Sequence, residues 1–112
     1  MTLQFFPRGA NMALSKLQLS QLLAVYGAML PPAQRETAAL YCDCDCTLSE
    51  VAEDKGISRQ AVRDAVVKAE KTLVRLENEL HIAQLAHDLL SAVEKEDYAE
   101  VSRIAKKFVG KE

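Results

Sequence analysis

Apolar side chains recur along the chain at helical spacing. Near the N-terminus they fall three or four positions apart and predict a helix over residues 15–30. The apolar face of this helix consists of Leu19, Leu22, Leu23, Tyr26 and Met29 or Leu30. Pro31 and Pro32 end it, and because proline suits a first helical turn, they also open a second helix over residues 32–42. The residues expected to be buried in that second helix are Ala38, Leu40 and Tyr41.

Capping residues mark the next two helices. The Thr47-x-x-Glu50 spacing predicts a capping box, in which the hydroxyl and the carboxylate each accept a hydrogen bond from a free backbone N–H. Gly56 suits the left-handed turn that ends the third helix, and Ser58 caps the fourth. No proline or glycine follows before Gly110, so the fourth helix is predicted to be long.

The long helix carries a heptad row, since its apolar or nearly apolar positions alternate four and three apart. The row consists of Val62, Val66, Ala69, Leu73, Leu76, Leu80, Ala83, His87 and Leu90. A final amphipathic helix is predicted over residues 97–109. Its inward side is expected to hold Tyr98, Val101, Ile104, Ala105 and Phe108.

Composition supports a fold of helices alone. Aromatic residues make up 5% of the 112 residues, and the apolar content is mainly Ala, Leu and Val, which favours helices packed on helices over a sheet. We predict an all-α fold, with a wingless helix-turn-helix, a long C-terminal helix and a final helix. Residues 1–13 are predicted to be a disordered lead-in, and residues 14–112 a single domain with the helix-turn-helix at 48–67.

Residues 48–65 satisfy the restricted positions of a helix-turn-helix. A small residue, Ala52, lies where the second helix crosses the first, and Gly56 follows four positions later in the turn. Ile57 is expected to plug the turn into the core. The second helix is expected to bury a stripe of Ala61, Val62 and Ala65.

The opposite face of that second helix is a candidate DNA-binding surface, because Arg and Gln suit phosphates and base edges. The candidate contact residues are Ser58, Arg59, Gln60, Arg63, Val67 and Lys71. Asp64 lies on the same face and would repel phosphate. The alternative is a solvated helix face with charge pairs four residues apart.

Because basic and acidic side chains are nearly equal in number, any nucleic-acid site must be a local patch of basic residues. The net charge is −2, and residues 47–80 carry six basic and seven acidic side chains. Affinity for nucleic acid comes largely from neutralised phosphates, so this balance counts against a strong binder. No apolar run reaches the roughly 18 residues of a membrane span, and no secretion signal is recognised, so we expect a cytoplasmic protein.

Three cysteines, Cys42, Cys44 and Cys46, fall within five positions. They could form part of a zinc shell, but such sites need four ligands, and His81 and His87 lie on different faces of one helix. We therefore expect thiols in a polar connector and no metal or other cofactor. No phosphate-binding glycine loop or nucleophile–base set is present, so we expect no enzymatic activity.

Several short runs extend the helix-turn-helix pattern. They are Leu22-Leu23-x-x-Tyr26, Leu30, Gln34, Leu40-Tyr41, residues 48–52 and 56–62, Ala69-Glu70-Lys71-x-Leu73 and Leu76-Glu77-x-x-Leu80. Together they resemble the YlxM-like proteins of Gram-positive bacteria, which are encoded beside the signal recognition particle GTPase. Residues 56–62 are also similar to region 4 of sigma factors. The chain departs from the family pattern at residues 42–46, where relatives usually have Ala, Asp and aromatic residues.

The resemblance implies an accessory or regulatory role linked to the signal recognition particle pathway. Two functions stay open. In the first, the chain binds DNA as a homodimer through a leucine seam of Leu73, Leu76 and Leu80. In the second, it binds a protein or RNA component of the signal recognition particle. The acidic balance favours the second, and the residue types on the exposed face favour DNA. The leucine seam has an alternative too, because the same stripe can fold back onto the first two helices of a monomer.

Overall fold

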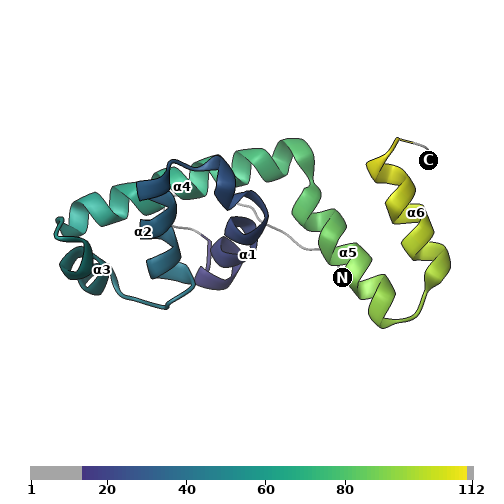
Figure 1. Cartoon of the computed structure of the whole chain (residues 1–112), viewed down its shortest axis with the longest axis horizontal. Coiled ribbons are helices and arrows are strands. Elements are labelled where there is room, and N and C mark those ends of the chain that lie inside the picture. The colour runs from purple at the N-terminus through teal and green to yellow at the C-terminus, as the bar shows by residue number, and fades with distance from the viewer. Residues whose placement is uncertain (1–13, 111–112) are drawn as a thin grey trace. The chain divides into compact units, whose positions relative to one another are not determined.

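A computed structural model describes residues 14–110, so the predicted lead-in over residues 1–13 lies outside it. All regular secondary structure in this part of the chain is helical, as the apolar pattern predicts. The elements are α1 (Lys16–Tyr26), the 3-10 helix η1 (Gly27–Met29), α2 (Pro32–Cys42), α3 (Leu48–Lys55), α4 (Arg59–Leu80), α5 (Ile82–Glu94) and α6 (Tyr98–Phe108) (Figure 1). They divide into two compact units, residues 14–80 with α1–α4 and residues 81–110 with α5 and α6.

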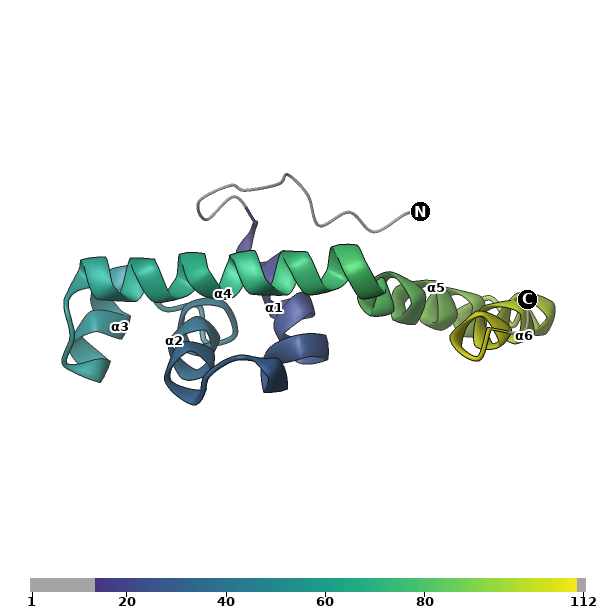
Figure 2. The ribbon, with the colours of Figure 1, turned by 90° about the horizontal axis from the view of Figure 1, so that it is seen from above.

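The first unit is built around α4. Helices α1, α2 and α3 each pack against it, and Figure 2 shows all three on the same side. The α4 residues buried there form an apolar row of Val62, Val66, Ala69, Leu73 and Leu76. The shorter helices contribute Leu19, Leu22, Ala38 and Val51 to the same core. Because burial of one large aliphatic side chain contributes about 1.5–3 kcal/mol, this row is the main source of stability in the unit.

Two glutamates of α4 are buried beside the apolar row. Glu77 is 3% exposed, and its Oε1 accepts a hydrogen bond of 2.5 Å from the Tyr26 hydroxyl. Glu70 is equally buried, and its Oε2 accepts a longer one of 3.4 Å from the backbone N–H of Leu14. A buried carboxylate is costly unless it is hydrogen-bonded. The two bonds therefore favour one position of α1 along α4.

Helix ends follow the predicted capping chemistry. In α3, the Thr47 hydroxyl accepts from the Glu50 N–H at 3.1 Å, and the Glu50 carboxylate accepts from the Thr47 N–H at 2.8 Å, which confirms the capping box. Ser15 and Gln18 form a second capping box at the start of α1. Gly56 has φ +69° and ends α3 in the left-handed conformation predicted for it.

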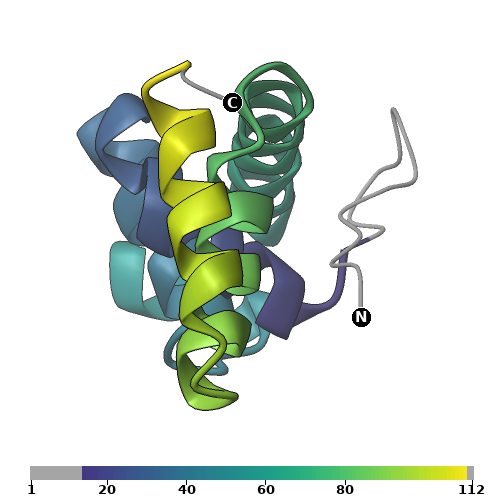
Figure 3. The same cartoon turned by 90° about the vertical axis from the view of Figure 1, so that its right-hand side faces the viewer.

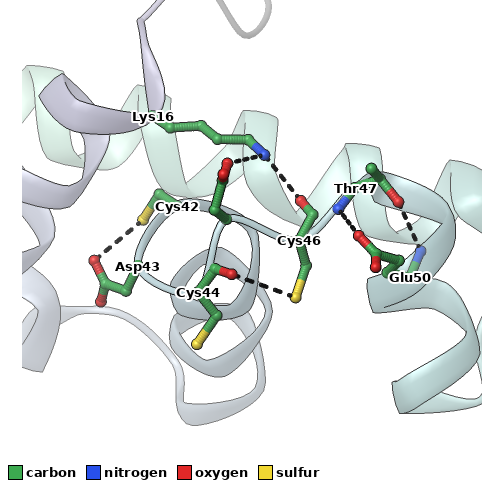
Figure 4. Close-up of polar contacts among 8 residues, drawn as sticks. Lys16, Cys42, Asp43, Cys44, Cys46, Thr47 and Glu50 are labelled. Atoms are coloured by element: carbon green, nitrogen blue, oxygen red, sulfur yellow. Dashed lines mark hydrogen bonds and ion pairs between the residues drawn. The ribbon is translucent and has the colours of Figure 1, made fainter.

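The connector between α2 and α3 is bound by Lys16 of α1 (Figure 4). Its Nζ donates to Oδ1 of Asp45 at 2.9 Å and to the carbonyl of Cys46 at 3.0 Å. The same ammonium lies 4.6 Å from the centre of the Tyr41 ring, within the range of a cation–π contact. One side chain thus links the start of α1 to the segment that leads into α3.

The three thiols of this connector have different surroundings. Cys42 is buried, Cys44 is exposed and Cys46 is half-buried. The Sγ of Cys42 is directed toward Asp43, with its Oδ1 at 3.7 Å, whereas the Sγ of Cys46 lies 3.9 Å from the carbonyl oxygen of Cys44 (Figure 4). Burial, assisted by the Asp43 carboxylate, raises the pKa of the Cys42 thiol to about 12. Cys42 is therefore a neutral thiol at ordinary pH.

The second unit is an antiparallel pair of helices, α5 and α6, which lie side by side in Figures 1 and 3. Asp97 caps α6 by accepting from the backbone N–H of Glu100 at 3.1 Å. The buried apolar residues of this unit are few and mostly small: Ala83, Ala92 and Ile104. Two helices alone bury little apolar surface, and the exposed apolar residues described below follow from that.

The prediction that one long helix carries the whole heptad row from Val62 to Leu90 is wrong. Helix α4 ends at Leu80, and His81 adopts φ +57° before α5 begins. The heptad row continues across this break because it records only the spacing of side chains. Neither glycine nor proline marks the position, but histidine is among the residues that enter the left-handed region more readily than most.

Several side chains predicted to be inward are at the surface. Met29 lies in η1, since α1 ends four residues earlier than the helix predicted over residues 15–30, and it is exposed. In α6, Ile104 is buried and Val101 is half-buried, while Tyr98, Ala105 and Phe108 are exposed. The apolar face of α6 is wider than the strip that one neighbouring helix can cover. Leu40 and Tyr41 in α2 are half-buried.

We expect Tyr26→Phe to lower the free energy of unfolding by about 1–3 kcal/mol, because it removes the hydroxyl that donates to buried Glu77 and keeps the ring. The matched control is Tyr41→Phe in the same unit, where the ring rather than the hydroxyl contacts Lys16. It should stay within about 0.5 kcal/mol of the parent. Urea denaturation followed by circular dichroism measures both, and equal losses would contradict the role given to the Tyr26–Glu77 bond.

We expect iodoacetamide to alkylate exposed Cys44 well before buried Cys42 in the folded protein. The thiolate is the reacting species, and a pKa of about 12 leaves almost none of it on Cys42 near neutral pH. Peptide mass spectrometry after limited labelling resolves the two sites. Asp43→Asn should speed the labelling of Cys42 by removing a neighbouring negative charge, whereas Asp88→Asn in α5 should not. Equal rates at Cys42 and Cys44 would overturn this expectation.

Candidate nucleic-acid interface

Helices α3 and α4 form the predicted helix-turn-helix. Ala52 is buried in α3, which packs against α4. The turn is a Schellman motif, in which the Ile57 N–H donates to the carbonyl of Ala52 at 3.0 Å and Gly56 is left-handed. The Ser58 hydroxyl then accepts from the backbone N–H of Ala61 at 3.0 Å and caps α4. A backbone hydrogen bond thus fixes one end of the turn, and the Ser58 side-chain cap fixes the other.

Two residues predicted to lie in the core are at the surface. Ile57 is 41% exposed rather than plugged into the core, and Ala61 is exposed rather than part of the buried stripe. The stripe begins at Val62, and a neighbouring residue lies about 100° away around a helix. Ala61 is on the side of Val62 that turns toward solvent, and Ala65 is half-buried.

The candidate contact residues lie together around the first half of α4. Arg59, Gln60, Arg63 and Lys71 are exposed, and Val67 is half-buried. The Gln60 side chain is engaged within its own helix, since its Nε2 donates to Oδ1 of Asp64 at 2.9 Å. Ser58 uses its hydroxyl as the helix cap, so it lies at the edge of this face.

The exposed side of α4 is more basic than the sequence suggests. Five basic side chains lie exposed between residues 59 and 75, namely Arg59, Arg63, Lys68, Lys71 and Arg75. The acidic residues in the same span are Asp64, which is exposed, and Glu70, which is buried. Lys68 and Arg75 were not among the predicted contacts. A helical projection centred on Val62 and Val66 places them away from the core and would have found them.

Helix α3 has the opposite charge. Its exposed side chains include Glu50, Glu53 and Asp54. Lys55 at its end pairs with Glu36 of α2 at 2.7 Å, and this hydrogen bond holds the pKa of the Glu36 carboxyl below its ordinary value. Within the helix-turn-helix the basic surface therefore lies on α4, and a polyanion that contacts α4 would be repelled by α3 if it extended that far.

The leucine seam does not form a free surface. Leu73 is completely buried and Leu76 is 8% exposed, because both belong to the α4 row that packs against the shorter helices of the same chain. Leu80, the last residue of α4, is half exposed. A dimer contact through Leu73 and Leu76 would require the core of residues 14–80 to open, so the predicted seam is corrected to a core element.

The cysteines do not converge on one point. Figure 4 shows the Cys42 sulfur directed toward Asp43, away from Cys44 and Cys46. Within residues 14–110, no three His, Cys, Asp or Glu side chains are grouped closely enough to hold a metal ion. In the same part of the chain, no helix combines the length and the apolarity needed to cross a membrane.

Known proteins resemble this chain over most of its length. Residues 14–108 match the model of the UPF0122 family, described as "Putative helix-turn-helix protein, YlxM / p13 like". A UPF0122 protein of Mycoplasma capricolum is 38% identical over 85 residues, which cover 76% of this chain and 75% of that protein. UPF0122 proteins of Clostridium botulinum and Streptococcus pneumoniae are 36% identical over 69 residues and 33% identical over 88. The match to the Clostridium botulinum protein covers 62% of this chain and 63% of that protein. The match to the Streptococcus pneumoniae protein covers 72% of this chain and 80% of that protein.

No solved structure matches the chain. The family assignment therefore stands on the sequence matches, and the geometry of α3 and α4 agrees with the helix-turn-helix in the family description. The chain belongs to the UPF0122 family of YlxM/p13-like helix-turn-helix proteins.

Proposed function

We propose that this chain is a regulatory protein that binds duplex DNA through the exposed face of α4. The observation that carries the proposal is the charge of that face, with five basic side chains and one acidic side chain exposed between residues 59 and 75. Arg75, the last of the five, pairs with Glu79 at 3.7 Å, so the excess of positive charge is greatest from Arg59 to Lys71. They lie on the second helix of a helix-turn-helix, which is the helix that enters the major groove in proteins of this architecture. Neutralised phosphates would supply most of the affinity.

The proposed contacts with DNA are of two types, to phosphates and to base edges. Arg59 is at the first residue of α4 and suits a phosphate, whereas Gln60 and Arg63 lie further onto the exposed face and suit base edges. Gln60 donates to Asp64 in the free protein, so a base would have to replace that partner. Loss of the Gln60–Asp64 hydrogen bond would lower the affinity for DNA sites at which no base forms a hydrogen bond with Gln60.

A second function is favoured by the acidic surface of α3 and by Asp64. These groups would weaken a broad contact with duplex DNA and are compatible with a smaller basic contact. In this alternative the chain is an accessory protein that binds a protein or RNA component of the signal recognition particle machinery. Titrations of duplex DNA and signal recognition particle RNA in parallel, at low and moderate salt, distinguish the two, because the tighter and more salt-sensitive ligand identifies the function.

A homodimer is also proposed, now through α5 and α6 in place of the leucine seam. This helix pair exposes several large apolar side chains, namely Ile82, Leu90, Val93, Tyr98 and Phe108. Its charges are separated along its length, with Glu94, Glu96 and Asp97 at the turn and Lys106 and Lys107 at the far end of α6. Two copies related by a two-fold axis could set the acidic turn of one pair against the basic end of the other.

We expect the Arg59→Ala, Arg63→Ala double variant to bind mixed-sequence duplex DNA more weakly than the parent. Each lost phosphate contact should lower the slope of log affinity against log salt by about one. Asp64→Asn should act in the opposite direction and tighten binding, because it removes a repelled charge. Fluorescence anisotropy at several salt concentrations measures these effects.

Arg103→Ala is the matched control, since it removes one exposed arginine from α6, outside the proposed surface. It should leave the salt slope unchanged, and all variants should keep the parent's thermal stability. A folded double variant that binds DNA as the parent does would end the DNA proposal. So would a parent with no salt-sensitive binding.

We expect light scattering at micromolar concentration to give the mass of a dimer. Leu90→Glu should produce a monomer with unchanged helix content, because it places a charge in the exposed apolar face of α5. Leu17→Glu is the control, as Leu17 is exposed on α1 and should leave the dimer intact. A monomer mass for the parent would contradict the homodimer.

A further inference from the structure

An apolar surface lies beside the basic face where α4 begins. Ile57 is 41% exposed just before the helix, and Ala61 is exposed in its first turn. We infer that these two side chains contact the 5-methyl group of thymine, so that the chain prefers A·T pairs at the positions next to α4. The inference rests on the proposed binding of duplex DNA and adds the chemistry by which that surface would select a sequence.

Hydrogen bonds on both sides of Ile57 hold the backbone of the turn in place before any ligand arrives. On one side, Gly56 is left-handed and the Ile57 N–H donates to Ala52 at 3.0 Å. On the other, the Ser58 hydroxyl accepts from the Ala61 N–H at 3.0 Å, which joins the turn to the first turn of α4. A contact made by Ile57 or Ala61 would therefore cost little conformational entropy.

The chemistry around the pair indicates what it fits. Arg59 is exposed two residues after Ile57, and Arg63 is exposed one turn later, so both would bring phosphates to this end of α4. An isoleucine exposed at the start of this helix needs an apolar partner to leave water favourably. Among the groups that base pairs present in the major groove, the thymine 5-methyl is the apolar one, and small apolar side chains are its usual contacts.

The partial burial of Ile57 has a structural explanation. In a Schellman motif the residue after the left-handed glycine often packs against the end of the preceding helix, here near Ala52. Such a contact would account for the part of Ile57 that is covered. It explains neither the exposed remainder nor Ala61, which lies in α4 outside the motif. A measurement of thermal stability separates the structural role from the DNA contact.

The test compares two duplexes of one A·T-rich sequence, about two helical turns long, made with thymine or with deoxyuridine. Uracil lacks the 5-methyl group and keeps the same hydrogen-bonding edges. We expect the thymine duplex to bind about fourfold more tightly for each methyl group that is buried. Ile57→Ala and Ala61→Ser should each bring this thymine-to-uracil ratio toward one, and Ile57→Val should keep most of it.

Two control variants isolate the effect. Arg63→Ala should weaken binding to both duplexes alike and preserve the ratio, because a contact made by arginine does not depend on the methyl group. Val25→Ala, which truncates a partly exposed valine of α1, should change neither affinity nor ratio. Ala61→Ser keeps the test decisive if Ile57→Ala lowers the melting temperature, since Ala61 is exposed and lies outside the turn.

The outcomes are distinct. A parent that binds both duplexes in a salt-sensitive manner but with a ratio of one overturns this inference and leaves DNA binding intact. A ratio that persists in folded Ile57→Ala and Ala61→Ser also overturns it, because the methyl group is then contacted elsewhere. The absence of salt-sensitive binding to either duplex refutes the proposed function itself, and this inference falls with it.

Discussion

The burial of one apolar row on α4 determines the arrangement of residues 14–80. Val62, Val66, Ala69, Leu73 and Leu76 can leave water only if other helices cover them, and α1, α2 and α3 do so from one side. The other side of α4 must then face outward. The same constraint that stabilises the unit therefore selects which charged residues form its surface, and it excludes Leu73 and Leu76 from any contact with a second chain.

Much of the fold follows from short-range rules that a sequence displays. The box formed by Thr47 and Glu50, the left-handed Gly56 and the cap at Ser58 are local, because each depends on residues a few positions apart. The break at His81 is different. It has no breaker residue, and the apolar spacing continues through it, so a rule based on spacing alone predicts one helix where there are two.

The sequence predicted which helix carries the candidate site, but not the position of every side chain around it. Gln60 and Lys71 are exposed because the period of the helix places them opposite Val62 and Val66, and Arg63 lies at the flank of that face. Arg59 shares the side of Val62 and is exposed as the first residue of α4. The surface position of Ala61 follows from its place about 100° around α4 from Val62, whereas that of Ile57 depends on how closely α3 and α4 approach at the turn, which is a property of tertiary packing. The bond from Gln60 to Asp64 is compatible with their spacing but competes with other rotamers that the sequence allows equally well.

Burial keeps the carboxylates of Glu70 and Glu77 out of direct contact with a ligand, although both still contribute to the net charge of the chain. In an electric field or on an ion exchanger, the molecule responds with its whole net charge of −2. A polyanion held against α4 responds mainly to charges within a Debye length, about 8–10 Å at physiological salt. Migration as an acidic protein, as its pI near 5.7 implies, is therefore compatible with a helix face that is locally cationic. For helical proteins that separate basic and acidic side chains between helices, an isoelectric point is a poor guide to their affinity for nucleic acids.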